Sequence, residues 1–437
     1  MNFLEKARNI SFWMIDKMRG NEIKNALITL QNCEDGIWTE QQVHHYQEKE
    51  IKKLLEYAKK NVPFYKNQKN LDLSCWPIVN KTILKVNGIN AISEEYSPEN
   101  LIHMYTSGST GIPFDCMQNV RKKRHVNAET IFYNGKIGYS VGKRIIYLRS
   151  IVTENEKRRI DQFAQNIHFL DCNDLSDAGI KSNLKKIVKL SKGCGAMLMG
   201  YGSTFTAYKQ YFVKYGTEEV KNAEIYGIVS GSDMLYDKTR EAMENAFKCK
   251  CVSRYANEEN GFIGQDDSEN NVFISNRADY YIEILKFDED KKADENEIGR
   301  IVVTDLYNYG MPMIRYDTGD VGAYIRVEHN NRERLAIGNF GGRIVDTVYD
   351  TNRNLVSPHA ISNLFWKYQE ITQFQFIQKN LMSYDVKVVA DENKLRVKEL
   401  TTELKSTLGD SANINIIFTD NIPTLSSGKR RYIVNES

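Results

Sequence analysis

Hydrophobic and polar positions change their spacing along this chain of 437 residues. Helical spacing dominates to about residue 95. Apolar segments of strand length then alternate with helical ones, in IIYLRS from Ile145, AMLMGY from Ala196 and EIYGIVSG from Glu224. Such alternation predicts α/β layers.

A second pattern begins at Val272 and runs to Ile325. It consists of the segments VFISN, YYIEILKF, RIVVTDL and VGAYIRV, with turn-forming residues between them. Strands that follow one another without helices predict an antiparallel sheet. We interpret the acidic run from Asp288 to Glu297 as a hairpin loop within it.

A third pattern follows the segment Asn339 to Val348. Strand-like KYQEITQFQFIQ, YDVKVVA and INIIF surround a predicted helix from Val397 to Leu408, which indicates a small α+β unit. We place the domain boundary at Gly341 to Arg343. The prediction is a large domain over residues 1–342, helical to about residue 95, and a small domain over residues 343–437.

The first 20 residues, MNFLEKARNISFWMIDKMRG, mix apolar and charged positions at helical spacing. They lack the continuous apolar core and the cleavage site of a signal peptide. We predict an amphipathic helix that packs on its own domain, with contact to a membrane surface as the alternative. No segment approaches the roughly 20 apolar residues of a membrane span.

The composition of the chain argues against one class of function, the binding of nucleic acid. With 41% hydrophobic residues and a net charge of +2, the chain can bury a large core but offers no electrostatic case for binding nucleic acid. We interpret the basic run from Arg121 to His125 as a solvated helix start, with a docking site for a phosphate-bearing acceptor as the alternative.

The seven cysteines are an odd number without a framework spacing. This usage indicates a reducing compartment and therefore a cytoplasmic protein. Cys249 and Cys251 form a pair, but no nearby Cys or His completes a tetrahedral set, which argues against a structural zinc.

The segment YTSGSTGIPF, from Tyr105 to Phe114, is typical of a phosphate-binding loop. Hydroxyl donors come from Thr106, Ser107, Ser109 and Thr110, and Gly108 and Gly111 let backbone N–H groups approach phosphate oxygens. It is not a Walker loop, because no Gly-Lys-Ser/Thr follows at the required distance. The loop predicts binding of ATP.

Three further segments follow in order: RYANEENG from Arg254, MPMIRYDTGD from Met311 and SSGKRR from Ser426. Together with the loop they resemble the adenylate-forming superfamily. Within it they resemble the branch of phenylacetate-coenzyme A ligase and the related proteins of capsular-polysaccharide clusters. LLEYAKKNVPFYKN from Leu54 and WPIVNKTIL from Trp76 also resemble that branch, so the match covers nearly the whole chain.

The resemblance implies an α/β fold: a large N-terminal adenylate-forming domain of layered sheets and helices, and a small mobile α+β C-terminal domain. It implies ATP- and Mg²⁺-dependent activation of a small carboxylic acid to an acyl adenylate. The acyl group would then pass to a thiol, of coenzyme A or of a phosphopantetheine arm on a separate carrier protein. The alternative acceptor is an amine or hydroxyl of a sugar precursor, as in capsular or exopolysaccharide biosynthesis. A homodimer also stays open.

The resemblance also assigns roles to individual residues. It implies that Thr106, Ser107, Gly108, Ser109, Thr110 and Gly111 bind the β- and γ-phosphates, that Gly231, Ser232, Asp233 and Tyr255 surround the adenine, that Asp320 binds the ribose hydroxyls, that Arg343 contacts the nucleotide, that Glu259 holds Mg²⁺, and that Lys429 bridges the carboxylate and the α-phosphate. The open alternatives are a solvated acidic loop for Glu259, a buried ion pair for Asp320 and a surface lysine for Lys429.

The chain departs from the family pattern in three places. Ala256 replaces a Gly, Glu258 replaces a hydroxyl residue beside Glu259, and Val345 stands where relatives carry the pivot residue. These departures motivate a second hypothesis, a catalytically degenerate nucleotide-binding partner protein.

The acid pocket is expected between Phe132 and Tyr139, at Gly200 to Thr204 and at the Gly231 strand end. Within it, Tyr133 and Tyr201 are equally well explained as pocket walls or as core.

Overall fold

The computed structural model describes residues 1–106, 114–151, 158–267, 272–330, 332–343, 348–353, 355–356, 361, 364–365, 367–368, 370–423 and 432–436. For residues 106, 341–343 and 355 it describes the backbone alone. No helix in these ranges combines the length and the apolar character needed to cross a membrane.

The N-terminal part is helical, as predicted. Helices α1 (Phe3–Met18), α2 (Glu22–Glu34), α3 (Glu40–Asn61) and α4 (Lys81–Asn87) precede the first strand, β1 (Ile102–Thr106). α1 and α3 begin with reciprocal capping boxes, at Asn2 and Thr39, which satisfy backbone N–H groups that the helix itself leaves without acceptors.

Helix α1 packs on its own domain through one face only. Phe12 and Trp13 pack against a core cluster that includes residues of α2. Phe3 and Met18 are 83% and 86% exposed. The prediction that the helix packs on its own domain therefore holds for its inner face, whereas apolar residues of its outer face lie on the surface.

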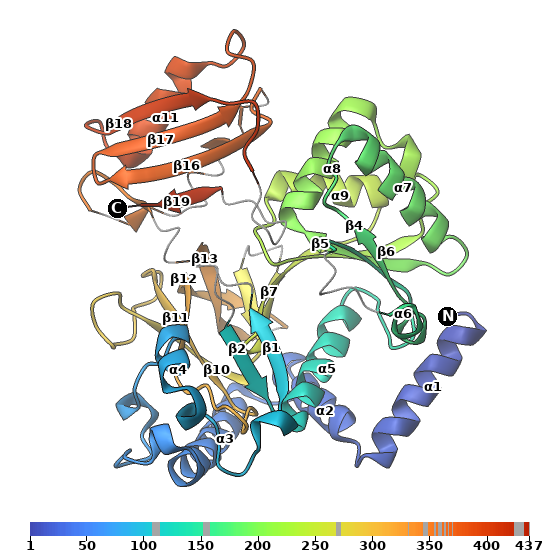
Figure 1. The fold of residues 1–437 in the computed structure, drawn as a ribbon, viewed down its shortest axis with the longest axis vertical. Helices are drawn as coiled ribbons and strands as arrows, with labels where there is room; N and C mark the ends of the chain where they lie inside the picture. Colours follow the sequence, from blue (N-terminus) through green and yellow to red (C-terminus); the bar gives the residue numbers. More distant parts are fainter. Residues whose placement is uncertain are drawn as a thin grey trace.

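One sheet of 11 strands forms the centre of the large domain (Figure 1). Its parallel half contains β3 (Ile145–Arg149), β4 (Ile167–Asp171), β5 (Ala196–Tyr201), β6 (Ile225–Gly231) and β7 (Cys251–Asn257). Its antiparallel half contains β8 (Gly261–Asp267), β9 (Val272–Ser275), β10 (Tyr280–Leu285), β11 (Gly299–Asp305), β12 (Tyr316–Glu328) and β13 (Glu333–Arg343). Both predicted sheet types are confirmed, and the acidic run lies between β10 and β11.

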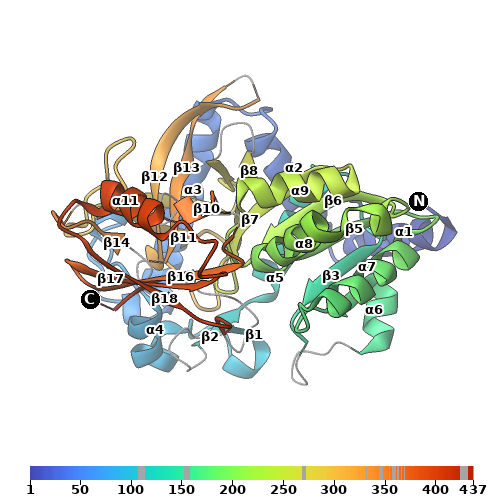
Figure 2. The ribbon, with the colours of Figure 1, turned by 90° about the horizontal axis from the view of Figure 1, so that it is seen from above.

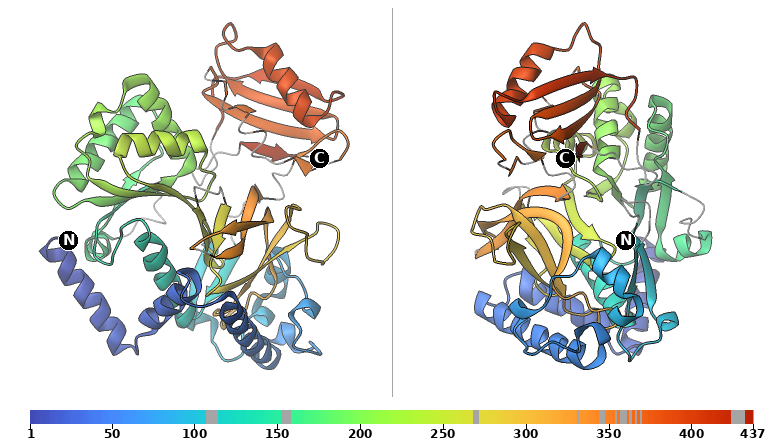
Figure 3. Two further views of the ribbon diagram at one scale, coloured as in Figure 1. Left: turned by 180° about the vertical axis from the view of Figure 1, so that it is seen from behind. Right: turned by 60° about the vertical axis from the view of Figure 1, so that its left-hand side comes forward.

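Helices cover both faces of the parallel half (Figure 3). On one face α7 (Asp177–Ser191), α8 (Gly202–Tyr215) and α9 (Asp237–Phe247) bury Leu148, Leu198 and Ile228. On the other face Ile137 and Tyr139, which follow α5 (Val120–Gly135), pack against strand residues. α6 (Arg159–Gln165) lies between β3 and β4 in the chain, and β2 (Phe114–Gln118) pairs with β1 as a separate hairpin.

The C-terminal part has its own sheet and core (Figures 1 and 2). β16 (Gln373–Asn380), β17 (Ser383–Val389), β18 (Asn413–Phe418) and β19 (Ile433–Asn435) are ordered β18-β17-β16-β19, with α11 (Val397–Leu408) against them and the small pair β14 (Val348–Tyr349) and β15 (Leu355–Val356) nearby. The predicted α+β pattern is confirmed.

A buried polar network joins α5 to the antiparallel half. Lys122 Nζ lies 2.8 Å from Asp305 Oδ2 and donates to the Tyr280 hydroxyl at 2.8 Å. His125 Nδ1 lies 2.6 Å from Asp279 Oδ1. Lys122 and His125 are only 0% and 7% exposed. The interpretation of Arg121 to His125 as a solvated helix start is therefore wrong for these two residues, because they are buried against Asp279, just before β10, and against residues of β10 and β11.

Candidate active site

Glu259 lies in the tight turn between β7 and β8. The Asn257 side chain accepts the backbone N–H of Asn260 at 2.7 Å and closes the turn, and Gly261 follows with a positive φ of 112° that favours glycine. Glu259 is 3% exposed, whereas Glu258 is exposed. The two carboxylates predicted to lie side by side are thus in different environments.

Two side chains contact the buried carboxylate of Glu259, both at Oε1. Lys81 Nζ, from the first residue of α4, lies 2.6 Å away, and the Tyr316 hydroxyl donates at 3.1 Å. Burial raises the pKa of Tyr316, and the neighbouring Glu259 raises it further. Lys81 lies in WPIVNKTIL, but no site role was predicted for it or for Tyr316.

The base of the β1–β2 hairpin lies beside the same turn. The Gln118 amide donates to the backbone oxygens of Glu258 and Glu259 at 3.3 and 3.2 Å, and Cys116 Sγ lies 3.5 Å from the Glu259 oxygen. The predicted phosphate loop connects these strands. Thr106 is the last residue of β1, and Ser107, Gly108, Ser109, Thr110 and Gly111 lie outside the described residues.

Asp320 and Tyr255 meet where β12 begins and β7 ends. The Tyr255 hydroxyl donates to Asp320 Oδ2 at 2.9 Å, and the Tyr255 ring packs 4.6 Å from that of Phe340. Burial, together with the Asp320 charge, raises the pKa of Tyr255. In the sheet register Asp320 pairs with Arg343, so the backbone brings two predicted nucleotide contacts together.

The end of β6 carries the predicted adenine loop. Ser232 has a φ of 71°, a left-handed conformation that is uncommon for a residue with a side chain and often marks a functional turn. The carboxylate of Asp233 accepts the backbone N–H groups of Gly202 and Ser203, the latter at 3.1 Å. Since these groups begin α8, Asp233 complements the positive end of the helix dipole.

Lys429 lies outside the described residues. Three residues later, the Tyr432 ring lies 5.8 Å from that of Tyr236, which follows the β6 loop. The Gln210 amide of α8 also donates to the Thr372 backbone oxygen at 2.5 Å. The C-terminal unit therefore contacts the large domain beside the predicted adenine loop.

The two tyrosines proposed for the acid pocket differ in their surroundings. Tyr133 stacks on Phe262 at 4.3 Å and belongs to a core cluster with α2 residues. Tyr201 is 8% exposed at the end of β5, directly opposite Gly231. Tyr133 is thus core, and Tyr201 borders the strand ends where ligands bind in open α/β sheets.

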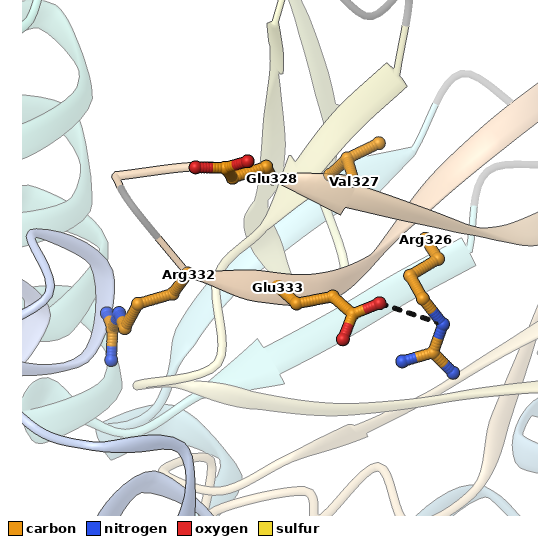
Figure 4. A pocket seen from close by; sticks show the side chains of 5 residues that line it. All are labelled: Arg326, Val327, Glu328, Arg332 and Glu333. Carbon is orange, nitrogen blue, oxygen red and sulfur yellow. Dashed lines mark ion pairs between the residues drawn. The ribbon is translucent and has the colours of Figure 1, made fainter.

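Among the described residues no group of three or more His, Cys, Asp or Glu could hold a metal ion; a single Glu suits Mg²⁺ when phosphate oxygens supply other ligands. A hollow at the tip of the β12–β13 hairpin is lined by Arg326, Val327, Glu328, Arg332 and Glu333 (Figure 4). It lies at the opposite end of β12 from Asp320, roughly 25 Å along the strand.

Comparisons with known proteins agree with this fold. Residues 348–436 match the family described as CapK C-terminal domain. Protein CapK of Staphylococcus aureus is 23% identical over 435 residues, covering 93% of this chain and 90% of that protein. The structure of 2-hydroxyisobutyryl-CoA ligase, in its postadenylation state with R3-HIB-AMP, has a TM-score of 0.69 at 14% identity and covers 89% of each chain.

A second ligase structure matches over a smaller part of its own chain. The anthranilate CoA ligase AuaEII, in complex with anthranoyl-AMP, has a TM-score of 0.57 at 14% identity, covering 77% of this chain and 66% of that one. The resemblance predicted from the motifs is confirmed, and this chain has the fold of the two-domain adenylate-forming ligases.

Proposed function

We propose that this protein is an ATP- and Mg²⁺-dependent ligase that activates a carboxylic acid. A carboxylate oxygen attacks the α-phosphorus of ATP, the bond to pyrophosphate breaks, and an acyl adenylate forms. An acceptor then attacks the acyl carbon and AMP leaves. The acceptor is a thiol of coenzyme A or phosphopantetheine, or an amine or hydroxyl of a sugar precursor. The likeness to Protein CapK supports the sugar precursor and a role in capsular or exopolysaccharide biosynthesis.

One observation carries this proposal: the fold brings separate predicted nucleotide segments to one place. Glu259, the base of the β1–β2 hairpin and Tyr316 are in contact, and four residues after Tyr316 the carboxylate of Asp320 is bonded to Tyr255. An unrelated fold would have no reason to collect these motifs at the carboxyl ends of β6 and β7.

The proposed roles follow the chemistry of each group. Asp320 accepts hydrogen bonds from the ribose hydroxyls, because an ionised carboxylate is an acceptor only. Glu259 holds Mg²⁺, which supplies charge neutralisation on the phosphates when bound. The Thr106 to Gly111 loop binds the β- and γ-phosphates, Gly231, Ser232, Asp233 and Tyr255 border the adenine, and Arg343 contacts the nucleotide.

We further propose that residues 343–437 form a mobile lid that brings Lys429 to the reacting carboxylate. An ammonium on a flexible stem suits charge that moves between oxygens. The last strand of the large sheet ends at Arg343 and the C-terminal core begins at Val348, so the few residues between them, including Val345, are the proposed hinge.

The test is ATP–pyrophosphate exchange with Mg²⁺ against a panel of aryl, fatty, hydroxy and amino acids. Exchange with one acid that is lost in Lys429→Ala supports the proposal. ATP binding without exchange for any acid would contradict it and favour the degenerate partner protein, which Ala256 and Glu258 suggest.

A further inference from the structure

Four residues of neighbouring parallel strands form one row across the sheet. The register pairs Tyr201 of β5 with Gly231 of β6. Two residues earlier along the strands, the register aligns Tyr147, Met199, Val229 and Val252. Two residues further along, the same register positions hold Arg149, Tyr201, Gly231 and Arg254, of which the Tyr201 side chain packs with the α7–α9 cluster.

This row lies at the carboxyl ends of the strands and has an opening in it. Within the described ranges, a Cβ added to Gly231 would meet no atom within 4 Å. Arg254 lies on β7, next to the β6 strand of Gly231. Arg149 lies on β3, on the other side, with Tyr201 of β5 between them. Two arginines therefore bracket an open space where open α/β sheets bind ligands.

The guanidinium of Arg254 contacts an aromatic ring and an amide. Its guanidinium carbon lies 4.1 Å from the Phe262 ring centroid, and Nη2 donates to Asn134 Oδ1. Among the described residues no carboxylate forms an ion pair with Arg254, although the charge of Glu129 acts on it. Its Nε is shielded from solvent and has no acceptor among them. Desolvation by burial lowers the pKa of Arg254 to about 10.

Two further donors near this space also lack acceptors. Asn134 is 0% exposed, and its Nδ2 has no hydrogen-bond partner among the described residues. Arg149 Nε is likewise buried without an acceptor there, and its guanidinium lies 5.7 Å from the Tyr147 ring. Buried donors are normally paired in native proteins, so donors that gather around an open space indicate an anionic ligand.

From these contacts we propose that the acid activated by this protein carries a second anionic group, a carboxylate or a phosphate ester, which Arg254 and Asn134 bind beside Gly231. This inference rests on the proposed ligase activity. The reacting carboxylate loses its charge when it joins the α-phosphorus, so pairing it with Arg254 would leave a buried cation unbalanced in the adenylate. A second anion keeps the arginine paired throughout the reaction.

The experiment compares probe acids that differ in one anionic group: succinate with butyrate, and 3-phosphoglycerate with glycerate. In ATP–pyrophosphate exchange the wild-type protein is expected to prefer one acid with a second anionic group over its matched monoanion by about 100-fold, as expected for a desolvated charge pair. Arg254→Met should reduce that preference to about fivefold or less and keep exchange with the monoanion, and Arg254→Lys should restore part of it.

Arg326→Met, an arginine at the remote hairpin tip, is the matched control and should retain the full preference. Equal exchange with each probe acid and its matched monoanion in the wild-type protein would overturn the inference. So would a fall in ATP affinity in Arg254→Met that matches the fall in exchange, since it would assign the arginine to the nucleotide.

Calorimetry separates this inference from the ligase activity itself. If no acid supports exchange, the proposed function fails, and direct binding of succinate and 3-phosphoglycerate still tests Arg254. Binding of either probe that weakens at least about tenfold in Arg254→Met, as expected for a buried charge pair, supports the anion site. Absence of binding of both probes to the wild-type protein overturns it.

Discussion

The contact between Lys81 and Glu259 gives the sharpest test of the candidate site. Replacing Lys81 by Met removes the ammonium and keeps a side chain of similar length. Glu259 would remain 3% exposed, with the Tyr316 hydroxyl as the other partner of Oε1. A buried carboxylate that loses its cation is destabilised, so the free energy of unfolding should fall.

The size of the effect follows from distance and exposure. At the 2.6 Å separation of Nζ and Oε1, an effective dielectric constant of 20 gives a gross attraction of about 6 kcal/mol. The Lys81 side chain is 33% exposed, and solvent screening with the desolvation of Glu259 offsets most of that attraction. We expect Lys81→Met to lower the free energy of unfolding by about 2 kcal/mol.

A double-mutant cycle with Glu259→Gln, measured by urea unfolding, isolates the pair. The expected coupling free energy is about 1–2 kcal/mol. Lys85→Met, an exposed lysine on the same helix, should change stability by less than about 0.5 kcal/mol. A coupling below about 0.3 kcal/mol would refute the ion pair. Mg²⁺ with ATP should stabilise the wild-type protein more than Glu259→Gln, because only the wild-type protein has the carboxylate proposed to hold the cation.

Three further outcomes are expected. Gly202→Ala should cost about 1–3 kcal/mol in urea unfolding, because the added Cβ would clash with the Met234 backbone oxygen, whereas Gly135→Ala, with open space around it, should not destabilise. Tyr255→Phe removes the hydroxyl bonded to the proposed ribose-binding carboxylate and should weaken ATP binding by about fivefold in calorimetry. Burial raises the pKa of Glu129 to about 8, so its contribution to stability is complete below about pH 4.5 and is lost as the pH rises through 8; Glu129→Gln should flatten that decline, and an unchanged pH profile would contradict it.

Local sequence pattern predicted the elements of this fold well. Apolar runs of strand length gave the parallel strands, and the predicted helix from Val397 to Leu408 has the bounds of α11. These features depend on neighbours in the chain. The family motifs also located Asp320 and Tyr255, which the structure places in contact.

Features that depend on contacts between distant segments could not be predicted. Lys81 looks like an ordinary helix-start lysine until the turn after β7 places Glu259 beside it. Lys122 belongs to a basic run that is typical of a surface, and only the arrival of Asp305 explains its burial. The phosphate loop and Lys429 remain predictions of the motif resemblance.

The polar network around α5 also constrains the order in which the molecule can form. Residues 146–251 supply a complete apolar cluster from their own strands and helices, so this segment can collapse as soon as it leaves the ribosome. The ion pair of Lys122 instead forms only after Asp305 has been synthesised. The pair of Glu34 needs Arg334, 300 residues later. Chains are synthesised from the N-terminus at about 5–20 residues per second. The N-terminal helices are therefore made first, but they gain these tertiary contacts only after the later segments have been synthesised.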